Sequence, residues 1–296
     1  MNTNQSGNWK NPFENHISTP AKAEAKANEN LKSRENEYLK DGLWYCKTCN
    51  NPTQTFVQGY SEPQPTLCLC KQKEKADREA AERKKQIEAS RKRAFDSERS
   101  IRFKFTFAND DKRNAKASEA LKKYCDNFDE YKKSGGGYIL YSNQNGGGKT
   151  FLACAVANEL IDKGKRVFVT DFLALRDRLV DPKAYTFVNK DAFIKSLLDY
   201  DLVVIDDLGV EQSTEFMLEV EYRVIDTLTD ALVPLILTTN YTLAEIANAD
   251  GKCEDRSKRR VLDRLVGSCV PLSVDQPNGK SRRLEKCAEL TRQLPH

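Results

Sequence analysis

The feature that most constrains this chain is a glycine-rich loop that ends in a Lys-Thr pair, at residues 142–150. An apolar run precedes the loop (residues 138–141), and a segment with helical periodicity follows it (residues 151–160). Strand, glycine loop, Lys-Thr and helix in this order predict a P-loop. Backbone N–H groups of such a loop, together with the positive end of the helix, surround phosphate oxygens. A flexible glycine linker would need neither the Lys-Thr pair nor the flanking elements.

The loop supplies most of the nucleotide-binding residues that we predict. Lys149 is expected to reach the β- and γ-phosphates of ATP, and Thr150 to bind Mg²⁺ through its hydroxyl. Asn143 stands where the full pattern has glycine, and asparagine is a non-glycine residue that visits left-handed backbone routinely. The other loop residues assigned to nucleotide binding are Asn145, Gly146, Gly147 and Gly148.

A second motif is an apolar run that ends in two acids, at residues 202–207. Ligands of open α/β sheets bind beyond the carboxyl ends of the strands, so we expect these acids beside the P-loop. Asp206 is predicted to bind Mg²⁺, and Asp207 to orient the attacking water as a base. Alone, two acids after a strand are more typical of a turn and a helix cap. The P-loop upstream favours the catalytic interpretation.

A third motif is the apolar run that ends in Thr-Thr-Asn, at residues 235–240. Asn240 is predicted to contact the γ-phosphate and to act as a sensor of it. The alternative is that Asn240 caps the following helix. Thr242 is a second candidate for that cap, which would leave Asn240 available for the nucleotide.

A fourth motif is a basic segment at residues 256–265, in which Arg260 and Arg264 share one face of an expected helix. One interpretation is a solvated basic surface. The other is an arginine finger offered to the ATP of a neighbouring subunit, because a guanidinium group stabilises spread phosphate charge. The spacing alone favours neither.

Four of the nine cysteines are clustered, and they are Cys46, Cys49, Cys68 and Cys70. Four thiolates from two short segments suit tetrahedral Zn²⁺, and four protein ligands make a closed, structural site. The second pair is separated by one residue rather than two. An iron–sulfur cluster and unliganded thiols are the alternatives. The other five cysteines are predicted to be free thiols.

Charge is unevenly distributed along the chain. Residues 71–93 hold ten basic and five acidic side chains, whereas the net charge of the whole chain is +4. The rest of the chain is therefore slightly acidic. We expect this stretch to form a long charged helix, either a solvated connector or a surface that binds nucleic acid or a partner protein.

These patterns predict an α/β fold with four successive segments. Strands alternate with helices after residue 137, which is typical of a parallel sheet between helices. Residues 102–107 alternate apolar and polar positions and predict an extended lead-in to that core, and residues 21–39 have helical composition. The predicted segments are a disordered or helical N-terminus (1–40), a zinc-binding domain (41–71), a charged linker helix (72–100) and an ATPase domain (101–296).

No run is apolar and long enough to span a bilayer, and the N-terminus lacks the pattern of a signal peptide. We therefore expect a cytoplasmic protein.

Together the motifs resemble those of the DnaC/DnaI-type loaders of replicative helicases, and of the related IstB transposition ATPases, in the AAA+ superfamily. The resemblance covers about residues 100–290 and rests mainly on Ile205–Glu211 and Arg259–Leu265, which follow the P-loop in that family's order. It implies that Arg260 is the arginine finger and that Arg283 is a second sensor. Arg282 stands where the family often has an aromatic residue.

The resemblance implies an AAA+ ATPase, weak without DNA or partner, that uses ATP, Mg²⁺ and Zn²⁺. Such a protein loads a hexameric DnaB-like helicase onto single-stranded DNA, assembles into homo-oligomers, and uses ATP binding and hydrolysis to control helicase release. Two alternatives remain. One is an IstB-like transposition ATPase, which the cysteine segment disfavours. The other is a non-catalytic nucleotide-binding adaptor, which intact Lys149, Thr150 and Asp206 disfavour.

Overall fold

The computed structural model describes most of the chain and divides it into two compact units, residues 1–83 and 84–296. The predictions for residues 1–33, and for Asn143 and Asn145, lie outside the described residues. The described residues are 34–95, 101–142, 146–180, 183, 190–208, 215–242, 244–245, 256–275 and 281–294.

The N-terminal unit is built on two small hairpins. In the first, β1 (Glu37–Lys40) pairs with β2 (Leu43–Cys46) across a two-residue turn, Asp41-Gly42. Both turn residues have positive φ, 51° and 79°, as in the turn whose twist matches that of the flanking strands. The helix predicted over residues 21–39 is therefore wrong in its described part. The second hairpin pairs β3 (Gln54–Thr55) with β4 (Gln64–Pro65).

The predicted charged helix is α2 (Leu69–Ala94). Most of its side chains are exposed, as its charge pattern indicated, whereas several near its C-terminal end are half-buried or buried. It begins two residues before the predicted basic stretch and ends at Ala94, six residues before the predicted end of the linker helix. Basic residues lie in its last turn, where their positive charge interacts favourably with the negative end of the helix dipole.

The C-terminal unit contains a five-stranded sheet in which every paired strand is parallel, in the order β6-β7-β8-β5-β9. This confirms the predicted α/β core. Because β8 lies between the P-loop strand β5 and the acidic strand β7, the polar ends of three strands meet at one edge. The strands are β5 (Gly137–Tyr141), β6 (Val167–Asp171), β7 (Leu202–Leu208), β8 (Leu235–Thr239) and β9 (Cys269–Ser273).

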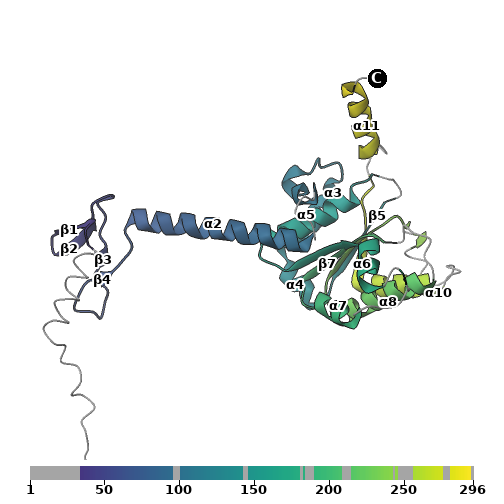
Figure 1. The fold of residues 1–296 in the computed structure, drawn as a ribbon, viewed down its shortest axis with the longest axis horizontal. Coiled ribbons are helices and arrows are strands. Elements are labelled where there is room, and N and C mark those ends of the chain that lie inside the picture. The colour runs from purple at the N-terminus through teal and green to yellow at the C-terminus, as the bar shows by residue number, and fades with distance from the viewer. Residues whose placement is uncertain are drawn as a thin grey trace, which may run out of the picture. The chain divides into compact units, whose positions relative to one another are not determined.

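Helices cover both faces of this sheet (Figure 1). Successive residues of a strand face opposite sides. Val204 therefore packs in the cluster with α5, whereas Val203 and Ile205 pack in the cluster with α8. One face carries α3 (Ala115–Asp126) and α5 (Lys149–Asp162), and the other carries α6 (Phe172–Leu179), α7 (Lys190–Leu197), α8 (Glu215–Asp230) and α10 (Arg256–Ser268).

The lead-in to the core is helical rather than extended, so that prediction is wrong. The chain forms two short 3₁₀ helices, η1 (Ile101–Lys104) and η2 (Phe107–Asn109). Asn158 on α5, which is fully buried, donates hydrogen bonds to the carbonyls of Arg102 (3.0 Å) and Phe105 (2.9 Å). These tertiary bonds satisfy backbone groups that a strand would have offered to a neighbour.

The remaining helices are α4 (Phe128–Lys133), which follows α3 after a break at Asn127, and α11 (Arg282–Gln293) near the C-terminus. In the described part of the chain, no helix combines the length and the apolar character that crossing a membrane requires.

Candidate functional site

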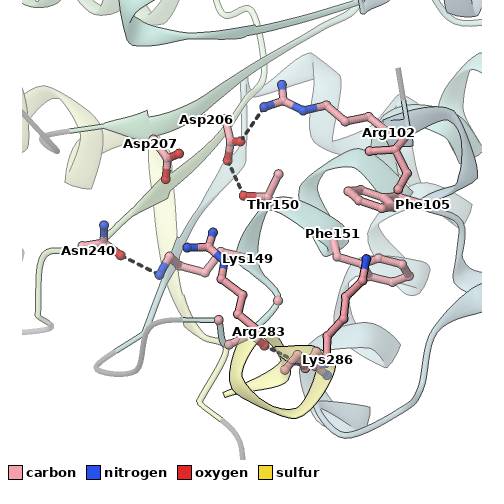
Figure 2. Close-up of a pocket in the computed structure, with 15 residues that line it drawn as sticks. Arg102, Phe105, Lys149, Thr150, Phe151, Asp206, Asp207, Asn240, Arg283 and Lys286 are labelled. Carbon is pink, nitrogen blue, oxygen red and sulfur yellow. Dashed lines mark hydrogen bonds and ion pairs between the residues drawn. The ribbon is translucent and has the colours of Figure 1, made fainter. Parts of the chain in front are cut away.

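A cavity of about 630 Å³ opens at the edge where the carboxyl ends of the strands meet (Figure 2). Its walls come from the P-loop, β7, the residue after β8, η1 and α11. The cavity therefore brings together residues that are up to 185 positions apart in the sequence, from Ile101 to Lys286. The predicted site residues that line it are Gly146, Gly147, Gly148, Lys149, Thr150, Asp206, Asp207, Asn240 and Arg283.

The loop requires glycine at the two positions before Lys149. Gly148 has φ 103° and precedes the first residue of α5, whose N-terminus points into the cavity. A Cβ on Gly147 would lie 2.9 Å from the carbonyl oxygen of Val274 and 2.7 Å from the Ser142 hydroxyl. No side chain fits there, so the backbone N–H groups stay open to an anion.

Lys149 and Asn240 contact each other across the cavity. The Lys149 ammonium donates to Asn240 Oδ1 at 2.7 Å, and only 7% of the residue is exposed. Burial lowers the pKa of Lys149, while the nearby carboxylates of Asp207 and Asp206 act in the opposite direction. The hydrogen bond to Asn240 thus fixes the position of the Lys149 ammonium next to the loop.

The alternative for Asn240 was that it caps the following helix, but Thr242 makes that cap. Its hydroxyl accepts from the N–H of Glu245 at 3.2 Å, and the Glu245 carboxylate accepts from the N–H of Thr242 at 2.7 Å. This reciprocal pair is a capping box. The side chain of Asn240 is left directed at Lys149.

Asp206 is the most heavily bonded group of the site. It is 2% exposed, and its Oδ1 accepts from the hydroxyls of Thr150 (2.9 Å) and Thr238 (2.6 Å). Its Oδ2 lies 3.3 Å from the guanidinium of Arg102. Thr238 also accepts from the N–H of Asp207 at 2.9 Å, so a single hydroxyl positions both acids. Sequence reasoning missed Thr238, although a threonine inside an apolar strand was the available signal.

Asp207 adopts left-handed backbone, with φ 57°, and its side chain is exposed at the cavity. Aspartate tolerates this conformation better than most residues. Partial loss of hydration at the cavity wall and the neighbouring Asp206 raise the pKa of Asp207. A carboxylate with a raised pKa is a better general base than an ordinary one.

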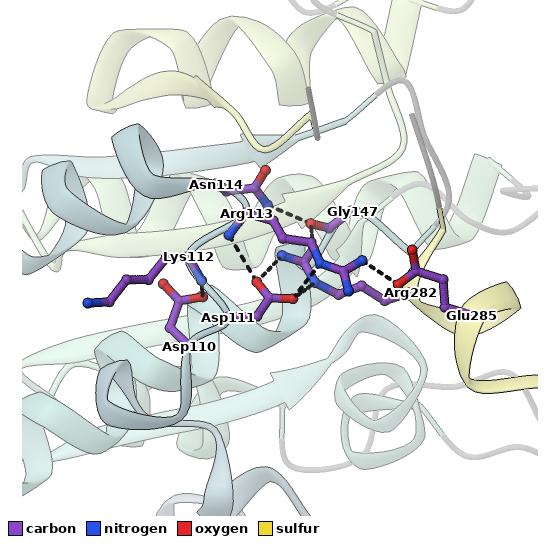
Figure 3. A network of polar contacts seen from close by, with 8 residues as sticks. All are labelled: Asp110, Asp111, Lys112, Arg113, Asn114, Gly147, Arg282 and Glu285. Atoms are coloured by element: carbon purple, nitrogen blue, oxygen red, sulfur yellow. Dashed lines mark hydrogen bonds and ion pairs between the residues drawn. The ribbon is translucent and has the colours of Figure 1, made fainter. Parts of the chain in front are cut away.

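The start of α11 is tied to the P-loop through Arg282 (Figure 3). Arg282 donates to both oxygens of Asp111, at 2.7 and 2.6 Å, and to the carbonyl of Gly147. Asn114 donates to the same carbonyl at 2.7 Å. Arg282 therefore supports the loop, and it holds the pKa of Asp111 below its usual range. One turn of α11 also brings Arg283 and Lys286 to the cavity.

Arg260 does not line the cavity of its own chain. It is exposed on α10, and its guanidinium carbon lies 4.2 Å from the centre of the Tyr222 ring, in cation–π contact. Arg264 is bound to Asp226 at 2.8 Å. Arg260 and Arg264 thus both contact α8, and Tyr222 is a partner of each.

The four clustered cysteines meet in the N-terminal unit, with all four sulfurs within 4.8 Å of one another. Cys46 ends β2 and Cys49 follows it, while Cys68 directly precedes α2 and Cys70 lies in its first turn. A tetrahedral zinc ion with Zn–S bonds of about 2.3 Å separates its sulfur ligands by about 3.8 Å, so the donor set fits that ion. The N–H of Cys70 lowers the pKa of the Cys49 thiol to about 6, and the neighbouring thiols raise the pKa of Cys70 to about 12.

The loop, the paired acids and the polar end of β8 define a P-loop nucleotide-binding protein. Residues 64–289 match the sequence model of a family described as IstB-like ATP binding protein, and the chain belongs to that family.

Two named relatives are loaders of helicases. The chain is 25% identical over 149 residues to the replicative helicase loader DnaC of Escherichia coli K12, covering 50% of this chain and 56% of the relative. It is 27% identical over 164 residues to the replicative helicase loader DnaI of Bacillus subtilis, covering 52% and 50%. The chain thus spans about half the length of the relatives it matches. The crystal structure of the DnaC helicase loader has a TM-score of 0.48 and 24% identity, over 59% of this chain and 99% of that one.

Proposed function

We propose that this protein is an ATP-dependent loader that places a replicative, DnaB-like helicase on single-stranded DNA. The observation that carries the proposal is the convergence of Lys149, Thr150, Asp206 and Asn240 on one cavity. This site lies in a chain whose relatives are named replicative helicase loaders. An adaptor that only binds nucleotide would not need the paired acids at that edge.

Each residue of the site has a separate role in binding or hydrolysing ATP. Lys149 binds the β- and γ-phosphates, the loop N–H groups bind phosphate oxygens, and Asp207 orients the attacking water. Asn240 and Arg283 contact the γ-phosphate and so distinguish ATP from ADP. Thr150 and Asp206 hold Mg²⁺, which neutralises charge on the phosphates when it is bound. Their oxygens already lie 2.9 Å apart, which supports this assignment.

The N-terminal unit holds Zn²⁺ through its four cysteines and binds the helicase, while the core binds single-stranded DNA and assembles into homo-oligomers. This division is supported by the separate compactness of the unit and by the fit of its sulfurs to zinc. ATP binding and hydrolysis control release of the helicase.

The test of the function uses the full chain and the replicative helicase of the same organism. The two proteins should co-purify, and the loader should increase unwinding of a forked duplex whose single strand is coated with single-stranded-DNA-binding protein. ATP should be required for this increase. No complex and no increase would overturn the proposal, and selective binding to a transposase would favour the IstB-like alternative that the family description suggests.

Replacing Cys49 by serine is expected to remove the metal from the N-terminal unit and to unfold it. A unit this small has little apolar core, so metal binding supplies much of its folding free energy. Elemental analysis should find about one zinc per wild-type chain and a large loss in the variant, while nucleotide binding by the core is unchanged. Cys287→Ser, at an exposed position of α11, is the matched control and should keep the metal. Wild-type protein purified without chelators that contains neither zinc nor iron would contradict the site.

A further inference from the structure

Arg102 lies at the side of the nucleotide cavity where the metal ion is expected (Figure 2). Its guanidinium is 3.3 Å from Asp206 Oδ2, and the aspartate side chain is 3% exposed. The other oxygen of Asp206 already accepts two hydroxyl hydrogen bonds. Arg102 is thus the cation that this buried carboxylate contacts within the described residues.

A magnesium ion held by Thr150 and Asp206 would compete with Arg102. The ion and the guanidinium are both cations, and each is stabilised by the negative charge of the same carboxylate. Placed side by side they also repel each other. Occupation of the carboxylate by one therefore weakens its contact with the other.

Arg102 belongs to a segment that is attached at both ends to other parts of the core. Phe105 packs on Phe151, the residue after Thr150, with ring centres 5.2 Å apart. Phe103 packs edge-on against Phe95, directly after the end of α2, at 5.4 Å. The Asn158 side chain holds the backbone of the segment between these contacts. A shift of η1 would therefore change the packing of Phe103 on Phe95, next to the last turn of α2.

We propose that Arg102 is a positioning residue that makes η1 responsive to magnesium–nucleotide. This inference rests on the proposed function, because it takes Asp206 as the metal-binding acid. Without nucleotide, Arg102 neutralises Asp206 and holds η1 against the site. Binding of magnesium–nucleotide displaces Arg102 from Asp206, and η1 loosens together with its contact to the end of α2. The ligand thus shifts a two-state equilibrium by its preference for the state in which the carboxylate is available.

The first test measures how binding of a fluorescent, non-hydrolysable ATP analogue to the full chain depends on Mg²⁺. Arg102→Gln removes the competing charge, so half-maximal binding should require roughly three- to tenfold less Mg²⁺, the range expected for one part-exposed ion pair. Lys104→Gln removes an exposed charge from the same segment and should behave as wild type. Arg102→Lys keeps a cation at the position and should lie between the two.

The second test follows hydrogen exchange of η1 in the wild type and in Arg102→Gln. The N–H of Phe105, the residue after η1, donates to the carbonyl of Arg102 in η1 at 3.1 Å. Its hydrogen exchange in the wild type should accelerate when Mg²⁺ is added to the nucleotide complex, and it should already be fast in Arg102→Gln without Mg²⁺.

Weaker nucleotide binding by Arg102→Gln with and without Mg²⁺ would show that Arg102 binds phosphate, and would overturn the inference. Normal nucleotide binding with unchanged magnesium dependence and unchanged exchange would overturn it too, while leaving the proposed function intact. A wild type that binds no nucleotide would overturn both.

Discussion

Replacing Lys149 by alanine is expected to abolish ATP turnover and to weaken nucleotide binding by roughly 100-fold, the loss that follows from removing a hydrogen bond to a charged group. The ammonium lies at the cavity, 2.7 Å from Asn240 Oδ1. No other residue of the loop carries a positive charge. Titration with a fluorescent ATP analogue and a phosphate-release assay measure the two effects.

Two variants show whether the loss is specific. Asp207→Asn should keep nucleotide binding and slow hydrolysis, because it removes only the base. Since the pKa of Asp207 is raised, wild-type hydrolysis should fall on acidification sooner than it would with an ordinary aspartate. Lys163→Ala, directly after the far end of α5, removes surface contacts with Asp126, Glu159 and the Cys125 carbonyl, none of which lines the cavity, and should leave turnover unchanged. Undiminished turnover in Lys149→Ala would overturn the P-loop assignment.

The sequence was sufficient for the core of this fold because its signals are local. Strands β6, β7 and β8 each begin with an apolar run, as expected of strands covered on both faces, and have polar residues at or near their carboxyl ends. The residues predicted at the nucleotide site lie at the ends of such runs. Parallel pairing then brings those ends together without further information.

Strand β9 was not predicted, because Pro271 interrupts its pattern. Proline cannot donate to a sheet ladder and is tolerated on an edge strand. The sheet order places β9 at an edge, next to β5. That position depends on the whole chain and is not visible in the five residues themselves.

The N-terminal hairpin was missed for a related reason. Asp41-Gly42 can end a helix or turn a hairpin, since both need a residue with positive φ. Short flanking segments such as β1 and β2 give too few positions to distinguish the two periodicities.

Other residues of the site could not be predicted because tertiary contacts place them. Arg102 and Asp206 are 104 positions apart, and Arg282 and Asp111 are 171 apart. Nothing near Arg102 in the sequence indicates that its guanidinium reaches a buried acid. Its position follows from the bonds of Asn158 and the packing of Phe105 on Phe151.

Mixing two inactive variants, Lys149→Ala and Arg260→Ala, is expected to restore part of the ATPase activity. An arginine finger contributes a factor of about 10³ or more to turnover, so Arg260→Ala alone should be nearly inactive in assembled protein. The structure supports action on a neighbour, since Arg260 is exposed and does not line the cavity of its own chain. In a mixed assembly, Arg260→Ala subunits keep an intact Lys149, and Lys149→Ala subunits supply an intact Arg260.

The recovered activity should have a defined size. In a random 1:1 mixture with head-to-tail interfaces, about one quarter of the interfaces pair an intact site with an intact arginine. Turnover should approach that fraction of the wild-type value, and it should rise with protein concentration. Arg259→Ala, an exposed neighbour on α10, should be active alone. If mixing restores nothing under conditions in which the wild type assembles, the contact between Arg260 and Tyr222 is structural, and the basic segment is a solvated or DNA-binding surface.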